Sequence, residues 1–163
     1  MKKMPVDRKK IGRAERIDFP SLGLLKVPAK IDTGADVSSI WATNIRKTPE
    51  GLRFVLFDKS SAHYTGQEIL VTPSAFTITR ISNSFGVKEL RFKVKLTIRV
   101  KNKRIRGTFT LSDRSKKTYP ILLGRRLLSG KFIVDVTRGK PLRKTERYKK
   151  KILKKELKRL EQV

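Results

Sequence analysis

Alternating apolar and polar residues dominate the middle of the chain and predict β-strands. In the clearest run, residues 91–100, every second residue is apolar, and basic or hydroxyl residues lie between them. The apolar residues are Phe92, Val94, Leu96, Ile98 and Val100. Because successive side chains of a strand point to opposite faces, this run predicts one buried face and one basic, solvated face. Residues 101–103 then predict a hairpin turn, and residues 104–111 predict the partner strand.

Other short apolar runs, each bounded by turn residues, predict further strands. They lie at residues 22–30, 52–57, 69–72, 76–82 and 132–136. Residues 119–128 predict a buried strand followed by a helical turn. We therefore expect a mostly β domain over residues 17–137, preceded by a basic N-terminal arm at 1–16 and followed by a basic helical tail at 138–163.

The tail changes in character after Pro141, which can begin a helix. Apolar residues recur there at helical spacing among lysines and arginines, at Leu142, Tyr148, Ile152, Leu153, Leu157 and Leu160. This spacing predicts a basic amphipathic helix. Two interpretations stay open: the helix contacts a polyanion, or it is a solvated helix that packs on the core through its leucines.

The charge of the whole chain favours acidic partners. There are 41 Lys and Arg against 14 Asp and Glu among 163 residues, a formal net charge of +27. Such a charge favours contact with RNA, DNA, ribosomes or anionic membrane surfaces. We find no RNP, KH, zinc-finger or helix-turn-helix pattern, so any such RNA or other polyanion contact is expected to be non-specific.

Several classes of chemistry are excluded by composition. There is no cysteine and a single histidine, His63, which rules out disulfides, thiol nucleophiles and ordinary His- or Cys-based metal sites. We expect no metal and no cofactor. No run is long and apolar enough to cross a bilayer, and the basic N-terminus lacks the apolar stretch of a secretory signal, so we expect a cytoplasmic protein without a membrane span.

Residues 29–41 hold the candidate chemistry. Asp32 ends a predicted strand, and Thr33 and Gly34 form the turn before the next strand. Taken alone, an Asp-Thr-Gly triplet is compatible with an ordinary turn. A second segment, Ile-Leu-Leu-Gly-Arg at residues 121–125, also ends a buried strand in a turn, and a hairpin with a Gly-bearing loop at 82–86 lies between the two.

Together these segments resemble the retropepsin-like aspartic proteases, the half-size relatives of pepsin. More narrowly, they resemble the bacterial branch known as ATP-dependent zinc proteases. The elements occur in family order over residues 24–136. The resemblance implies a closed β-barrel of the acid-protease type and an aspartic endopeptidase. The chain lacks a GxxxxGK[ST] loop for ATP and an ordinary set of zinc ligands, so we expect neither ATP nor zinc dependence.

The resemblance also implies roles for individual residues. The catalytic group would be Asp32, with Thr33 bracing the catalytic pair and Gly34 lining the substrate backbone. The substrate-binding residues would be Ala35, Asp36, Ser84, Phe85, Gly86 and Arg125. Asp36 would contact substrate main chain and pair with Arg125, partly as a fold-stabilising ion pair. The flap residues, Ser84, Phe85 and Gly86, are the least direct match. Residues 49–73 lengthen this chain relative to the compact retroviral pattern, and the flap tip has one Gly rather than several.

Aspartic catalysis requires two carboxylates that share one proton, and this chain carries one Asp-Thr-Gly. The second aspartate must therefore come from another copy, which predicts a homodimer acting on a polypeptide substrate. A competing hypothesis is a non-catalytic polyanion-binding protein, for RNA or the ribosome, on the same fold. A third is a peptidase for acidic polypeptides, which its basic strand faces would gather.

Overall fold

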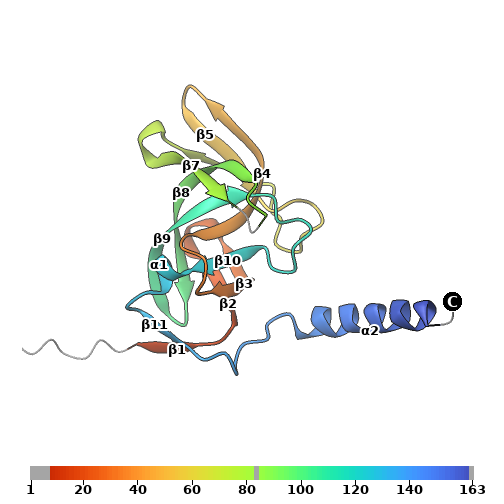
Figure 1. Cartoon of the computed structure of the whole chain (residues 1–163). Helices are drawn as coiled ribbons and strands as arrows, with labels where there is room; N and C mark the ends of the chain where they lie inside the picture. The colour runs from red at the N-terminus through yellow and green to blue at the C-terminus, as the bar shows by residue number, and fades with distance from the viewer. Residues whose placement is uncertain (1–7, 83–84, 162–163) are drawn as a thin grey trace, which may run out of the picture.

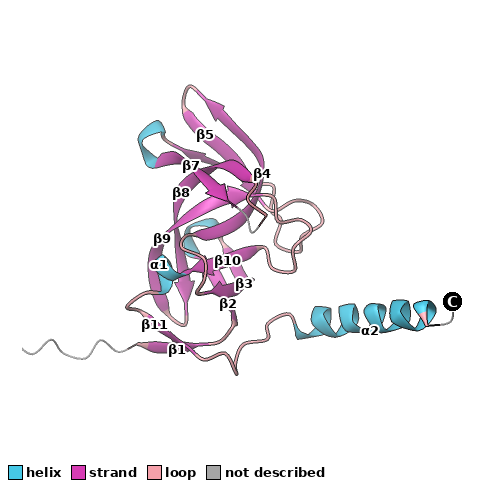
Figure 2. Ribbon diagram, viewed as in Figure 1, coloured by secondary structure: helices cyan, strands magenta, loops and turns pink. Residues whose placement is uncertain are grey.

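The computed structural model describes residues 8–82 and 85–161, and strands make up most of it (Figure 2). Short 3-10 helices lie at Pro20–Leu22 and Pro73–Ala75. In chain order the other elements are β1 (Lys9–Ile11), β2 (Ala14–Phe19), β3 (Leu24–Asp32), β4 (Ser38–Thr48), β5 (Gly51–Leu56), β6 (Glu68–Val71), β7 (Phe76–Ser82), β8 (Lys88–Val100), β9 (Lys103–Ser112), β10 (Ile121–Gly124), α1 (Arg125–Leu128), β11 (Phe132–Val134) and α2 (Arg143–Leu160).

A ring of strands closes the barrel (Figure 1). The order around it is β10–β3–β2–β8–β9–β4, and β10 closes the ring because it pairs in parallel with β3 and antiparallel with β4. β10 is therefore placed beside the strand before the Asp-Thr-Gly turn and the strand after it. The predicted mostly β, closed-barrel fold is confirmed.

The β8–β9 hairpin shows why the alternating pattern forms this barrel. Val94, Leu96, Ile98 and Val100 are buried, and the positions between them are exposed or half-buried. The connecting residues Lys101 and Asn102 both have positive φ, the geometry that suits the right-handed twist of two paired strands. Four phenylalanines of the core are fully buried: Phe19, Phe54, Phe57 and Phe109. Each contributes about 1.5–3 kcal/mol by leaving water.

The sheet begins earlier than the predicted domain boundary at residue 17. β1 pairs in parallel with β11, and β2 is a strand of the barrel itself. Ile11 and Ala14 are buried, so these two residues of the predicted arm belong to the core, whereas Lys10, Arg13 and Arg16 are exposed. Glu15 and Arg16 interrupt the apolar pattern here, which is why the sequence alone suggests a charged extension.

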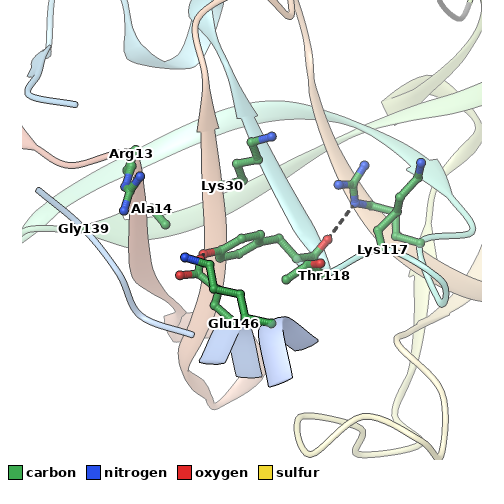
Figure 3. Close-up of a pocket in the computed structure, with 10 residues that line it drawn as sticks. Arg13, Ala14, Lys30, Lys117, Thr118, Gly139 and Glu146 are labelled. Carbon is green, nitrogen blue, oxygen red and sulfur yellow. Dashed lines mark hydrogen bonds between the residues drawn. The ribbon is translucent and has the colours of Figure 1, made fainter. Parts of the chain in front are cut away.

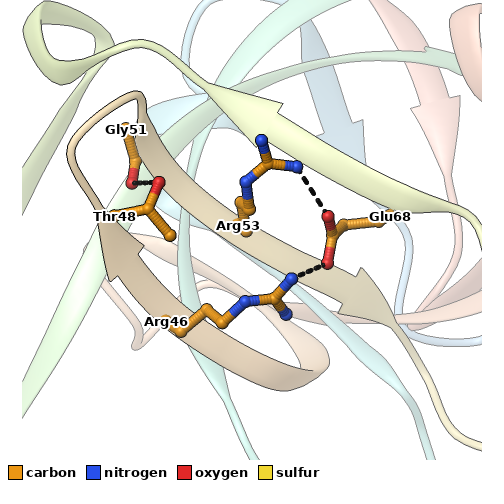
Figure 4. Close-up of polar contacts among 5 residues, drawn as sticks. All are labelled: Arg46, Thr48, Gly51, Arg53 and Glu68. Carbon is orange, nitrogen blue, oxygen red and sulfur yellow. Dashed lines mark hydrogen bonds and ion pairs between the residues drawn. The ribbon is translucent and has the colours of Figure 1, made fainter.

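The segment at 49–73 adds β5 and β6 beside β4, outside the ring. Arg46 and Arg53 both form ion pairs with Glu68, the second at 2.8 Å, as Figure 4 shows. The three side chains come from three neighbouring strands and align them. The addition therefore extends the sheet and leaves the order of the barrel strands intact.

Helix α2 extends away from the barrel (Figure 1). One interpretation of the sequence, that its leucines pack on the core, is wrong: Leu153, Leu157 and Leu160 are 54%, 51% and 73% exposed. The helix meets the body at its first turns, where the hydroxyl of Tyr119 donates a hydrogen bond of 3.0 Å to Glu146 Oε1. Helical periodicity predicts an apolar face but cannot say what covers it.

Candidate active site

The carboxylate of Asp32 is oriented by its own turn. Its Oδ1 accepts hydrogen bonds from the backbone N–H groups of Gly34, at 3.0 Å, and Ala35, at 3.1 Å. Such an Asx turn fixes the side chain relative to the backbone. Asp32 is half-buried, and Thr33 and Gly34 are exposed. The carboxylate is thus held in one orientation at a position that solvent reaches.

The Gly-Arg turn lies directly against this turn. Gly124 is the register partner of Asp32 in the parallel β3–β10 pair. The backbone N–H of Arg125 donates to the carbonyl of Ala35 at 2.8 Å, and that of Arg126 donates to the carbonyl of Asp36 at 3.2 Å. Two segments far apart in the sequence are therefore joined by backbone hydrogen bonds at the candidate site.

The close approach of these segments requires glycine at position 124. A Cβ there would lie 2.7 Å from the carbonyl carbon of Val37 and 2.9 Å from the carbonyl oxygen of Ala35. Both are backbone atoms, which cannot rotate away. The glycine in the Gly-Arg motif therefore has a packing role that sets the distance between β10 and the Asp32 turn.

Sequence reasoning missed the contribution of Ser38. Its Oγ accepts a hydrogen bond of 3.0 Å from the backbone N–H of Gly124, and the residue is 1% exposed. Beside it, the hydroxyls of Ser39 and Ser112 lie 2.8 Å apart and hydrogen-bond. Two adjacent serines next to the apolar residues 40–42 were the available signal, because buried hydroxyls need partners.

The expected contact between Asp36 and Arg125 is present, with Nε at 3.2 Å from Oδ1. A second, unexpected arginine joins it: Arg126 Nη2 lies 2.9 Å from Oδ2. The Asp36 side chain is 42% exposed, so each pair contributes little to stability, at most about 1 kcal/mol. The pairs are better suited to orienting the carboxylate than to holding the fold together.

The expected flap is a hairpin of β7 and β8, with Ser82 opposite Lys88. Phe85 and Gly86 lie at its tip, where Phe85 is 90% exposed and Gly86 has a φ of +75°. Ser84, the remaining predicted flap residue, lies outside the described residues. The hairpin exists where the sequence placed it, and contact between its tip and a substrate stays a prediction.

A cationic pocket of about 650 Å³ adjoins the strand that carries Asp32 (Figure 3). Its charged lining residues are Arg13, Lys30, Arg114, Lys117, Lys150 and Glu146. Lys30 precedes Asp32 by two positions in β3, so their side chains share one face of the strand. The pocket therefore opens on the same face as the candidate catalytic carboxylate, and five of its six charged side chains are basic.

Arg114 connects this pocket to the site electrostatically. Its Nε donates a hydrogen bond of 3.1 Å to the carbonyl of Tyr119. Burial, and then repulsion from Arg91, lower the pKa of Arg114, and attraction to the Asp32 carboxylate acts in the opposite direction. The sequence did not predict Arg91 or Arg114 as site residues, because only the tertiary fold brings these two side chains close together.

Tyr119 lines the pocket together with Glu146 and Lys150 of α2. Burial, and then the hydrogen bond to Glu146, raise the pKa of Tyr119 to about 12. The phenol therefore remains protonated and continues to donate to the Glu146 carboxylate at any physiological pH. The first turns of α2 are held at the edge of the pocket by this contact.

Neither a metal centre nor a membrane span is found among the described residues. His, Cys, Asp and Glu side chains do not gather there in groups of three or more. These residues thus do not fit the zinc ion implied by the name of the bacterial branch. Among the described helices, none is long and apolar enough to cross a bilayer.

A closed barrel in which an Asp-Thr-Gly turn is joined to a Gly-Arg turn by backbone hydrogen bonds has the architecture of a retropepsin-like protein. A family model described as RimB-like, "Retropepsin-like aspartic endopeptidase RimB", matches residues 10–145. The chain belongs to this RimB-like family, which confirms the resemblance drawn from the two motifs.

Relatives and a solved structure agree with the assignment at the level of the fold. A Shewanella pealeana protein named "Probable alpha-L-glutamate ligase" is 35% identical over 127 residues, or 77% of this chain. A Desulfotalea psychrophila protein of the same name is 30% identical over 132 residues, or 80%. The match spans 28% of each of these relatives. A Legionella pneumophila protein of unknown function superposes with a TM-score of 0.61 at 24% identity, over 80% of this chain and 95% of its own.

Proposed function

We propose that this chain is an aspartic endopeptidase that hydrolyses peptide bonds with two Asp32 carboxylates, one from each copy of a homodimer. The observation that carries the proposal is the half-buried Asp32 carboxylate, oriented by the Gly34 and Ala35 N–H groups at the end of a barrel strand in a RimB-like chain. We expect it to act in the cytoplasm.

The chemistry follows from two carboxylates that share one site. Ionising both is costly, so the pair holds a single proton. The ionised member takes a proton from water, which attacks the peptide carbonyl, and the neutral member gives its proton to the carbonyl oxygen. Collapse of the tetrahedral intermediate, with a proton delivered to the amide nitrogen, breaks the C–N bond and releases a carboxylic acid and an amine.

The need for a second copy is supported by what other acids in the chain do. Asp36 is engaged by two arginines. Asp113 accepts the N–H of Ser115 at 2.8 Å, and Asp135 accepts the N–H of Thr137 at 3.0 Å. None of these three belongs to an Asp-Thr-Gly turn. In the dimer, Thr33 would brace the pair and Gly34 would lie along the substrate backbone.

The other site residues would bind substrate. Ala35 and Asp36 would contact its main chain, with Arg125 orienting the Asp36 carboxylate. The β7–β8 hairpin would close over a substrate held as an added strand, through Phe85 and Gly86 at its described tip. This arrangement binds extended polypeptide with little dependence on side chains, so selectivity must come from neighbouring pockets.

The cationic pocket supports an acidic polypeptide as the substrate. Five basic side chains line it on the Asp32 face of β3. Carboxylate side chains of a peptide would find charge-assisted hydrogen bonds there. The names of the longer relatives, which refer to alpha-L-glutamate, point to the same chemical group. The net charge of +27 would also raise the local concentration of such a substrate.

The alternative is a non-catalytic polyanion-binding protein on the same fold, and the free basic helix favours it. Asp32→Asn separates the two. We expect this variant to lose about 10²–10⁴-fold of the rate on a glutamate-rich peptide, measured by mass spectrometry, with an unchanged circular dichroism spectrum. Asp58→Asn is the matched control, since Asp58 also forms an Asx turn, with Ser60 N–H at 2.7 Å, in a different loop. Equal cleavage by wild type and Asp32→Asn would overturn the Asp32 mechanism, and no cleavage by wild type with equal RNA binding by both proteins would favour the binding function.

A mixing experiment tests the dimer directly. Wild type and Asp32→Asn are combined in equal amounts at constant total concentration and allowed to exchange. Shared dyads predict about a quarter of the wild-type activity, because only dimers with two intact subunits work, whereas independent monomers predict about half. A value near half would exclude the shared dyad.

A further inference from the structure

Helix α2 carries an exposed row of leucines. Leu153, Leu157 and Leu160 follow each other at intervals of four and three residues, so they lie on one face of the helix. Their exposed fractions are 54%, 51% and 73%, and all residues from 150 to 160 are exposed. Three leucines on one face of a charged helix are more apolar surface than isolated exposure explains.

The same face is anchored at its start. Glu146 precedes Leu153 by seven residues, two helical turns, and accepts the hydrogen bond from Tyr119 of the barrel. The leucine row thus continues a face that is held against the body, and α2, which carries the row, extends outward from the barrel (Figure 1). Its direction is set by the body, while its outer turns are available to another surface.

The charge on α2 limits which kind of surface the helix can bind. The helix contains ten Lys and Arg and two Glu among its 18 residues. Like charges three and four positions apart repel, and an isolated helix of this length is marginal in water. An occupant that stabilises the helix must therefore be anionic, and it must also cover the leucines.

We propose that α2 binds the surface of an anionic lipid bilayer. The helix would lie in the plane of the interface, with its leucines at the boundary of the acyl chains and its lysines and arginines against the headgroups. Long lysine side chains can reach from a buried face back to the headgroups. A bilayer supplies an apolar layer beneath an anionic one, which matches both properties of the helix.

Two other occupants match only one property each. RNA would neutralise the basic side chains but leave the leucine row in water. A second copy of α2 would cover the leucines but bring two strongly basic helices together.

The family match ends at residue 145, so the outer helix lies beyond the segment shared with the RimB-like family. Leu153, Leu157 and Leu160 are not among the residues that line the cationic pocket, so substitutions there test the lipid contact apart from the peptidase site, although Lys150 of the same helix does line that pocket.

The test uses the full chain and vesicles of phosphatidylcholine with or without phosphatidylglycerol, separated by flotation. Wild type is expected to float with the anionic vesicles and not with phosphatidylcholine alone. Replacing the row by Leu153→Gln, Leu157→Gln and Leu160→Gln keeps the charge and is expected to weaken binding at least about 100-fold. Leu25→Gln is the matched control, because Leu25 is 58% exposed on the barrel and should not matter.

The charge arm uses Lys154→Gln, Lys155→Gln and Lys158→Gln, which should abolish the preference for anionic vesicles. If the leucine variant binds anionic vesicles as strongly as wild type, the proposal is wrong, and basic residues of the barrel attract the vesicles instead. RNA binding equal in wild type and leucine variant, without vesicle binding, would assign the helix to RNA. Self-association lost in the leucine variant would assign it to a second copy. Asp32→Asn should float like wild type, so this test is independent of peptidase activity.

Discussion

The Asp32 turn and helix α2 are both charged, surface-accessible segments, yet they are held in opposite ways. Around Asp32, hydrogen bonds at 2.8–3.2 Å, to backbone and to side-chain oxygens, join the turn between β3 and β4 to α1, and β10 to β4, and the side chains behind them are buried. In α2, residues 150–160 are all exposed. The first segment is oriented by the chain itself, and the second is oriented only at its start.

This difference explains how each segment can work. A catalytic carboxylate must be held in position before substrate arrives, because reorganisation during the reaction adds to the barrier. A docking helix has no such requirement, because its partner supplies the missing contacts on binding. Substitutions should therefore cost stability near Asp32 and cost only binding in α2.

The largest effect on stability is expected at Gly124. Gly124→Ala would place a Cβ 2.7 Å from the backbone of Val37 and force β10 away from the Asp32 turn. We expect the free energy of unfolding to fall by about 3 kcal/mol, measured by urea denaturation. Gly130→Ala, where nothing lies within 4 Å but φ is +71°, should cost about 1 kcal/mol. Equal losses in the two variants would show that the close approach does not constrain the site.

The next effect concerns Ser38. Ser38→Ala removes the acceptor of the Gly124 N–H and leaves that group buried without its partner. The expected loss is about 1–3 kcal/mol in the free energy of unfolding. Ser74→Ala, at an exposed position, should change it by less than about 0.5 kcal/mol. If Ser38→Ala leaves the free energy of unfolding unchanged, the two turns are held together without this hydroxyl.

A pH-dependent effect is expected at Asp18, within the barrel. The Lys26 N–H, at 2.8 Å, and then the Arg99 guanidinium, also at 2.8 Å, lower the pKa of Asp18 below its ordinary value of 3.8. Its stabilising contribution is therefore complete above that value and is lost as the pH falls through the lowered pKa. Asp18→Asn should cost about 1–2 kcal/mol at neutral pH.

The measurement for Asp18 is the difference in unfolding free energy between wild type and Asp18→Asn across the acid range. This difference should shrink as wild-type Asp18 becomes protonated. Glu15→Gln provides a comparison within the same strand, since Glu15 pairs with Lys101 at 3.4 Å. A gap between wild type and Asp18→Asn that persists at the most acidic pH would show that the charge is not its source.

The smallest effect is expected in α2. Leu157→Gln should change the free energy of unfolding by less than about 0.5 kcal/mol, because its side chain is 51% exposed. Leu123→Gln, at a fully buried position of β10, should cost several times more. A large loss for Leu157→Gln would mean that the helix packs on the barrel in solution, and the contrast between the two segments would disappear.

Much of the site could be predicted because its signals are local or motif-based. The Asp-Thr-Gly and Gly-Arg segments mark the two turns, and the family resemblance that they carry implied the Asp36–Arg125 contact. Ser38, Arg114 and Arg126 could not be found in the same way. Their roles depend on which strand neighbours which, and a hydroxyl or guanidinium has no periodicity that reveals its partner.

Apolar residues at every second position determined the strands of the β8–β9 hairpin, and apolar residues at helical spacing determined the apolar row of α2. Each repeat records which side chains can share a face. Tertiary structure decided that β10 closes the ring beside Asp32, that Ile11 and Ala14 join the core, and that the leucines of α2 stay uncovered. Those outcomes depend on contacts between segments far apart in the chain, whose free energies no local pattern contains.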